Sequence, residues 1–213
     1  MRTLLLAALF AFAPVAAAGE PPAPAAIPVA TVLSALAASS DQPVAYKASV
    51  ALHLRMRVFP FISMTLHGDS WYKRPGLYRF VFRGVPLIAR AFSDMKYDLG
   101  DPARWTERYD VAYAPGSTAA APILRLVPKN ALLVRWLDVA VEPQRGRILR
   151  AVWTRSDGGT IALVQTYAPG GPLHDVVAKQ IATIDLPRMK AELEADYDGF
   201  TNDAAQVGAI ENR

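Results

Sequence analysis

The stretch that decides the fold is residues 68–80, which read GDSWYKRPGLYRF. An amphipathic run enters a Lys-Arg-Pro-Gly corner, and a second, aromatic run leaves it. Pro75 fixes its own φ and lacks an N–H, and Gly76 tolerates positive φ, so this pair ends one strand and begins the next. We therefore expect a β-hairpin with Arg74 at its rim, where the planar guanidinium can reach backbone carbonyls of whatever covers the sheet.

The residues before this corner alternate with a period of two, which is typical of a strand with one buried face. After the turn at 59–61, Ile62, Met64 and Leu66 continue the pattern up to the corner. The first run is longer than the usual strand of about 5–6 residues. Its apolar positions, all expected on one face, are Val44, Tyr46, Ala48, Val50, Leu52, Leu54, Met56 and Val58.

Further strand patterns continue to residue 198. Asp157-Gly158 between two β-rich runs indicates a hairpin. In the last run, 189–198, good helix formers alternate strictly between apolar and charged, and the period of two outweighs their propensity. We expect about nine antiparallel strands. They are drawn from ten candidate runs, at 44–58, 62–73, 77–83, 109–114, 123–127, 132–141, 147–155, 160–167, 177–185 and 189–198.

Two segments carry helical spacing, Val29–Ser39 and Val85–Phe92, and Pro86 could start the second at its first helical position. Residues 94–108 are expected to form a loop with one helical turn. A long sheet with one apolar face must curl and cover that face. The fold class is therefore mainly β (α+β), a curved antiparallel sheet with the two helices as its lid.

The amino-terminal residues indicate export. Residues 1–18 have the pattern of a cleaved signal peptide, with Arg2, an apolar region and a small-residue site before Gly19. The alternative, an uncleaved anchor, is disfavoured because Pro14 interrupts a stretch shorter than the about 20 residues that span a bilayer. We expect a Pro/Ala linker at 19–28, a single domain at 29–200, a flexible tail at 201–213, and a soluble, periplasmic mature protein.

Composition excludes several classes of site. The 213 residues include no Cys, which rules out disulfides, Cys nucleophiles, Cys-based metal sites and lipid attachment to a Cys. The net charge is +4, and the Lys and Arg residues are scattered among 19 acidic residues, unlike the concentrated basic patch of a nucleic-acid binder.

The sequence does not favour an enzyme. His53 and His67 fall on polar faces of adjacent strands and, with Asp69, could ligate a metal, but no recognised metal-site spacing accompanies them, and solvated histidines are the simpler interpretation. No Gly-x-Ser-x-Gly elbow is present. The carboxylates at 192–198 form an acidic stripe suited to solvation and edge protection. We expect no catalytic residue, no metal and no cofactor.

The segment 68–80 closely resembles the strand–turn–strand of LolA-like periplasmic lipoprotein carriers, the outer-membrane lipoprotein-sorting family. The first helix, the first three strands and, more loosely, the carboxy-terminal strands share the resemblance, whereas residues 84–108 depart from it, as in a divergent member. The resemblance implies an unclosed half-barrel of nine or more strands with a short helical lid. It also implies that acyl chains lie between sheet and lid, and that Arg74, with Trp71, Tyr78 and Phe80 beside it, helps latch the lid.

The expected function is a carrier, or chaperone, that transports an acylated lipoprotein or lipid between membranes. Its expected partners are this cargo and, transiently, proteins of the inner and outer membranes, and we expect a monomer. The alternatives are an envelope sensor or adaptor module, and a ligand-free structural protein whose apolar residues pack on one another. The expected ligand-binding residues are Leu52, Leu54, Met56, Ile62, Met64, Leu66, Trp71, Arg74, Tyr78, Phe80 and Trp136.

Overall fold

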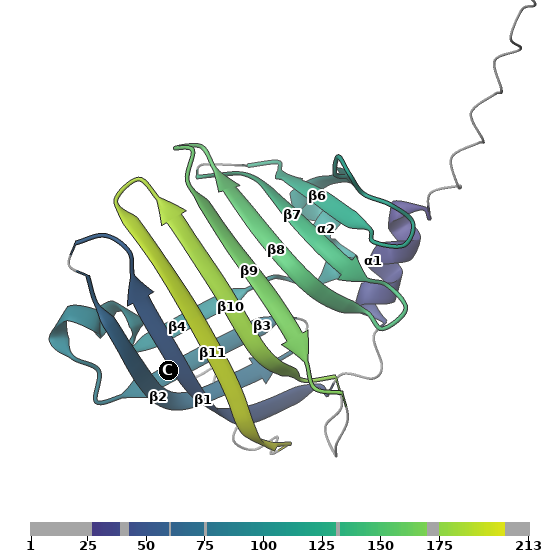
Figure 1. Cartoon of the computed structure of the whole chain (residues 1–213). Helices are drawn as coiled ribbons and strands as arrows, with labels where there is room; N and C mark the ends of the chain where they lie inside the picture. Colours follow the sequence, from purple (N-terminus) through teal and green to yellow (C-terminus); the bar gives the residue numbers. More distant parts are fainter. Residues whose placement is uncertain are drawn as a thin grey trace, which may run out of the picture.

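The computed structural model describes residues 27–38, 43–59, 61–74, 76–130, 133–169 and 175–202 (Figure 1). The signal peptide expected at 1–18 lies outside these ranges, as do most of the linker and most of the tail. None of the helices in the described ranges has the length and apolar character that crossing a bilayer requires.

Eleven strands form one antiparallel sheet, in the order β4-β3-β2-β1-β11-β10-β9-β8-β7-β6-β5. The first and last strands of the chain therefore pair with each other inside the sheet, and β4 and β5 are its two edges. The sheet is not closed, as expected. The strands are β1 (Ala45–Met56), β2 (Ser63–Lys73), β3 (Leu77–Arg83), β4 (Asp94–Asp98), β5 (Tyr109–Tyr113), β6 (Ile123–Pro128), β7 (Val134–Glu142), β8 (Arg147–Arg155), β9 (Thr160–Tyr167), β10 (Val177–Leu186) and β11 (Met189–Thr201).

The Lys-Arg-Pro-Gly corner is the hairpin expected from the sequence. Tyr72 pairs with Tyr78 across β2 and β3, and the Arg74 N–H donates to the Val44 carbonyl at 2.8 Å. Pro75 itself lies outside the described residues. On β1 the residues from Tyr46 to Leu54 at every second position are buried, whereas Val44 is exposed and precedes the strand.

The sheet curls so strongly that β2, β3 and β4 pass behind β9, β10 and β11 in the view of Figure 1. One close approach within the curl requires glycine. A Cβ on Gly68 of β2 would lie 2.2 Å from the Val81 carbonyl oxygen of β3, which no side chain can do without moving backbone. We call β1 to β4 with β11 one wing of the sheet and β5 to β9 the other; the curl brings the apolar faces of the two wings toward each other.

Two clusters of buried residues line this concave interior. The first joins β1, β2, β3 and β11, and the second joins β6, β7, β8 and β9. Ala182 of β10 packs against both clusters, so it marks the boundary between them. The strand expected at 189–198 is confirmed and extends to Thr201, with Ala191, Leu193, Ala195 and Tyr197 buried on one face.

The helix α1 (Val29–Ala37) buries Val32, Leu33 and Leu36 in the second cluster, together with Trp105. Figure 1 shows it beside β6 and β7, at one end of the sheet. The amphipathic pattern of this segment thus predicted both the helix and the face of the helix that packs against the sheet. The helix covers one wing of the sheet and leaves the first cluster to other elements.

The second expected helix differs from expectation. Residues Leu87–Phe92 form a 3₁₀-helix (η1) with Pro86 as its N-cap, and Ala89 buries itself against the first cluster. Its apolar residues are too few for a longer α-helix before β4 begins. The expected loop at 94–108 is also more ordered than predicted: it contains β4, a 3₁₀ turn (η2, Pro102–Arg104) and the short helix α2 (Trp105–Arg108).

Candidate binding cavity inside the sheet

A cavity of about 180 Å³ lies between the two wings, and strands from both wings line it. Gln180 carries the one side-chain amide in the lining, and its Oε1 accepts a hydrogen bond of 2.5 Å from the hydroxyl of Tyr197, which also lines the cavity. The amide oxygen of Gln180 therefore has a hydrogen-bond partner within the protein. The lining residues are Leu52, Phe80, Phe82, Met95, Trp153, Ile161, Leu163, Gln180, Ala182, Leu193, Ala195 and Tyr197.

The cavity exists because the residues at the meeting of the clusters do not fill the curl. Ala182 and Ala195 contribute only methyl groups from neighbouring strands, and the rings of Phe80 and Tyr197, both in the lining, have centroids 6.2 Å apart. An apolar cavity of ~150 Å³ in a protein can stay dry and accept a benzene-sized guest. This cavity is therefore large enough for a small apolar group.

Several residues expected to bind a ligand lie in or next to this cavity. Leu52 and Phe80 line it directly. Leu54 and Leu66 are buried in the adjoining first cluster, against which Met56 and Met64 pack. Ile62 is half-buried outside that cluster, and its carbonyl accepts from the Met56 N–H at 2.7 Å.

Two expected residues lie on the opposite face of the sheet from the cavity. Trp71 packs against Ala45, with the Lys47 ammonium 5.5 Å from its ring centroid. Trp136 stacks with the guanidinium groups of Arg125 and Arg135, at 4.9 and 5.1 Å. The structure thus corrects the expected position of Trp136 on the inner face, and it places Trp71, expected beside Arg74, on the outer face.

The wrong prediction of the face on which Trp136 lies has a local cause. A bulge between Val134 and Trp136 changes the register of β7 against β8, and the inner face continues with Leu137, Val139 and Val141. Both faces of this segment carry apolar residues, so alternation alone does not distinguish them. The missed cavity residues on β8 to β11 do show period-two patterns, but the pattern does not reveal that they face β3.

A second, smaller cavity of about 50 Å³ lies farther along the same strands, and we call it the polar chamber. Arg74 and Tyr78, both expected site residues, line it. Arg74 hydrogen-bonds the Tyr72 hydroxyl; burial raises the pKa of Tyr72, and the charge and hydrogen bond of Arg74 partly offset that rise. The lining residues are Leu36, Ala37, Tyr72, Arg74, Gly76, Tyr78, Leu99, Pro102, Gly146, Ile148, Gln165 and Tyr167.

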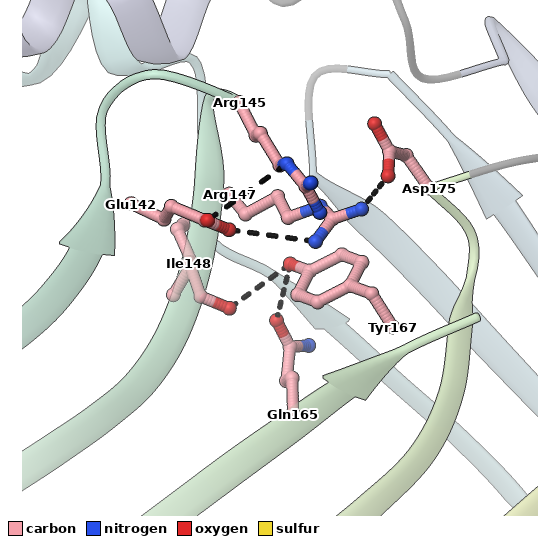
Figure 2. Close-up of polar contacts among 7 residues, drawn as sticks. All are labelled: Glu142, Arg145, Arg147, Ile148, Gln165, Tyr167 and Asp175. Atoms are coloured by element: carbon pink, nitrogen blue, oxygen red, sulfur yellow. Dashed lines mark hydrogen bonds and ion pairs between the residues drawn. The ribbon is translucent and has the colours of Figure 1, made fainter. Parts of the chain in front are cut away.

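A buried ionic cluster supports one wall of the polar chamber (Figure 2). Arg147, with a side chain 9% exposed, pairs with Glu142 at 3.4 Å and with Asp175. Its guanidinium carbon lies 4.8 Å from the ring centroid of Tyr167, which it holds against the wall. Arg145 approaches the same Glu142 at 3.9 Å.

Tyr167 connects this cluster to the chamber. Its hydroxyl lies 2.9 Å from the Ile148 carbonyl oxygen and 3.2 Å from Gln165 Oε1 (Figure 2). Burial raises the pKa of Tyr167 far above its ordinary value, so the hydroxyl stays protonated. The other amide atom of Gln165, Nε2, is buried without a partner among the described residues. An unpaired buried donor costs about 1–3 kcal/mol.

The histidines do not assemble a metal site in the described residues, where no group of three or more possible ligands occurs. His53 lies opposite Thr65 and shares a 2.8 Å hydrogen bond with its hydroxyl, whereas His67 lies opposite Ala51. Asp69, the third candidate, is paired with Lys47 and Arg83. His174 lies outside the described residues.

No protein-family model and no curated protein matches the sequence. Solved structures do match its fold. A LolA superfamily protein from Nitrosomonas europaea is 11% identical, covering 83% of this chain and 94% of its own, with a TM-score of 0.53. An outer-membrane lipoprotein-sorting protein domain from Vibrio parahaemolyticus is 9% identical, covering 81% and 91%, with a TM-score of 0.54.

A DUF1329 family protein from Desulfovibrio piger is 13% identical, covering 83% of this chain and 94% of its own, with a TM-score of 0.53. At such identities the likeness concerns the fold, and it extends over most of each chain. The unclosed eleven-stranded sheet with its short helices is therefore a LolA-like fold.

Proposed function

We propose that this protein is an exported, non-enzymatic carrier that binds the acyl chains of a lipoprotein or lipid in the apolar cavity and moves them between membranes. The observation that carries the proposal is the cavity of about 180 Å³ between the two wings, lined almost wholly by apolar side chains. Each methylene group buried there is worth about 0.8 kcal/mol. A longer chain would displace neighbouring side chains or the covering helix.

The position of α1 supports a lid that opens on one side. Leu36 and Ala37, the last residues of this helix, line the polar chamber together with Arg74. The last carbonyls of a helix have no partner within it, and a guanidinium is a suitable donor to them. In this proposal Arg74 latches the end of α1, and a membrane partner that prefers the open state would bias release.

The LolA-like fold and the signal-like residues 1–18 support the compartment that the proposal requires. One of the solved structures with this fold is a lipoprotein-sorting domain, and a periplasmic carrier needs an export signal of the kind expected here. In that compartment the partners would be acylated cargo and, transiently, proteins of the inner and outer membranes.

Native mass spectrometry of protein purified from a bacterial periplasm tests the proposal. Co-purifying acylated species support a carrier. A ligand-free mass, with no binding of added acyl compounds, would instead indicate a structural protein.

A matched pair of variants makes the test specific to the cavity. Ala182→Trp places an indole in the cavity and should abolish acyl binding. Ala162→Trp places the same group on the outer face, since Ile161 and Leu163 beside it line the cavity and successive residues alternate faces. Binding that survives Ala182→Trp would contradict the proposed location.

A further inference from the structure

The polar chamber and the apolar cavity lie in line along the inside of the sheet. On β3, Tyr78 lines the chamber and Phe80, two residues further along, lines the cavity. On β9, Gln165 lines the chamber and Leu163, two residues before it, lines the cavity. Residues two apart on a strand share a face. Gln165 also lies directly opposite Gln180, a cavity residue on β10. One elongated molecule could therefore occupy both spaces.

The chamber carries a buried donor that the described residues leave unused. Gln165 is 5% exposed, and its Nε2 has no partner among them, while its Oε1 contacts the Tyr167 hydroxyl. Nearly all buried polar groups in proteins have a partner, whether from protein, water or ligand. This amide is therefore suited to an acceptor oxygen that occupies the chamber.

The charge of the lining favours an anionic oxygen. Arg74 lines the chamber, and no carboxylate is among its lining residues. The nearby acids Glu142 and Asp175 both pair with Arg147, behind Tyr167. An anion in the chamber would meet a guanidinium and an amide N–H without facing a like charge in the lining. Charge-assisted hydrogen bonds of this kind are stronger than neutral ones.

We propose that the chamber is a head-group site, in which Arg74 and Gln165 bind the anionic oxygens at the head of an amphiphile whose chain lies in the apolar cavity. This inference rests on the proposed function, because it assumes that the cavity takes an acyl chain. A fatty-acid carboxylate and a phosphate both supply such oxygens.

Binding of laurate, dodecyl phosphate and dodecanol, each below its aggregation concentration, tests the head-group site. Trp153 lines the cavity, so its fluorescence should report binding of all three, and calorimetry provides the affinities. The wild-type protein should bind laurate about tenfold more tightly than dodecanol, as expected for one charge-assisted hydrogen bond. An affinity for dodecyl phosphate equal to that for laurate would show that the site also accepts phosphate head groups. A lower affinity for dodecyl phosphate would restrict the site to carboxylates.

Substitutions identify the responsible groups. Gln165→Leu should bring the affinity for laurate close to the affinity for dodecanol while leaving the affinity for dodecanol unchanged. Arg74→Met should weaken the binding of laurate more than the binding of dodecanol, because Arg74 also latches α1 in the proposed function. Arg83→Met is the matched control for the arginine, because Arg83 is largely exposed and pairs with Asp69. If Gln165→Leu does not fold, the side-chain amide resonance of Gln165 in the wild-type protein should shift with laurate and not with dodecanol.

Two outcomes would overturn the inference, and they are distinguishable. Equal affinity for laurate and dodecanol, unchanged by Gln165→Leu, would mean that the chamber holds only water, and the carrier proposal would stand. Failure of all three compounds to bind the wild-type protein would remove the carrier proposal as well.

Discussion

At the scale of single residues, the interior contains polar groups with very different surroundings. Arg147 is almost fully buried and has two carboxylate partners and an aromatic ring. Ser70, also buried on the inner face, has a hydroxyl without a partner among the described residues. A buried group that is paired and one that is unpaired should respond oppositely to removal.

Arg147→Met should destabilise the protein by about 3 kcal/mol, because it leaves the carboxylates of Glu142 and Asp175 without their common partner. The midpoint of urea unfolding measures the loss. Arg104→Met is the control, since Arg104 forms an exposed pair with Glu107 and its loss should hardly move the midpoint. Similar effects of the two substitutions would show that the buried cluster adds nothing to stability.

Ser70→Ala should raise the free energy of unfolding by about 1 kcal/mol, because it removes a buried hydroxyl that has no partner and keeps the Cβ. The same urea titration checks this expectation. A decrease in stability would indicate that the hydroxyl is hydrogen-bonded, for example to an ordered water.

At the scale of the elements, close strand contacts and edge pairs hold the curl together. The edge strand β4 pairs only with β3, and on its outer face Asp94 receives two hydrogen bonds from Arg79, at 3.0 and 2.7 Å. The hydrogen bonds from Arg79 lower the pKa of Asp94 below its ordinary value. The ion pair therefore links stability of this edge to pH.

A carboxylate whose pKa is lowered by folding stabilises the protein above its unfolded pKa, about 4, and loses this effect as the pH falls through the folded pKa. The wild-type protein should thus be more stable than Asp94→Asn at about pH 7. The difference should be smaller at about pH 3, because below its ordinary pKa the carboxylate protonates more readily in the unfolded chain than in the folded one. The effect is small because Asp94 is half exposed. Urea midpoints at the two pH values measure it; a difference undiminished in acid would point to another role for Asp94.

Gly68→Ala tests the close contact of β2 with β3. The added Cβ would lie 2.2 Å from the Val81 carbonyl oxygen, so the strands must separate, at a cost of about 1–3 kcal/mol. Ala48→Gly, on the neighbouring strand β1, is a useful comparison because it removes a methyl group without any clash. Hydrogen exchange of the β3 amides should accelerate in Gly68→Ala; unchanged exchange and midpoint would mean that the strands adapt without cost.

At the scale of the whole molecule, the curl creates an interior that is not completely filled. A compound that binds this interior in the folded state alone stabilises that state by mass action. Laurate at 100 times its dissociation constant should add about 2.7 kcal/mol to the free energy of unfolding. Thermal unfolding with and without laurate measures this, and Ala182→Trp should show no increase. An equal increase in that variant would locate binding outside the cavity.

Much of the element pattern could be predicted because its signals are local. Pro75-Gly76 ends one strand and begins the next whatever surrounds it, and strict alternation at 189–198 indicated a strand against helix propensity. The short strand β4 was missed because five residues give too few periods for a decision. Of the residues expected to bind a ligand, Leu52 and Phe80 line the cavity, and Arg74 and Tyr78 line the polar chamber. All four lie on the segments whose sequence patterns are clearest.

By itself, the sequence determined the alternating strands, the hairpin at Arg74, the helix α1 and the exclusion of Cys chemistry, since each depends on neighbours along the chain. Only the tertiary structure decided that Trp136 faces outward, that Leu52 and Tyr197 share a cavity, and that Gln165 and Arg74 share a chamber. The reason is physical: a bulge and the curl of a sheet bring together residues distant in sequence, and their joint geometry depends on the packing of all the strands at once.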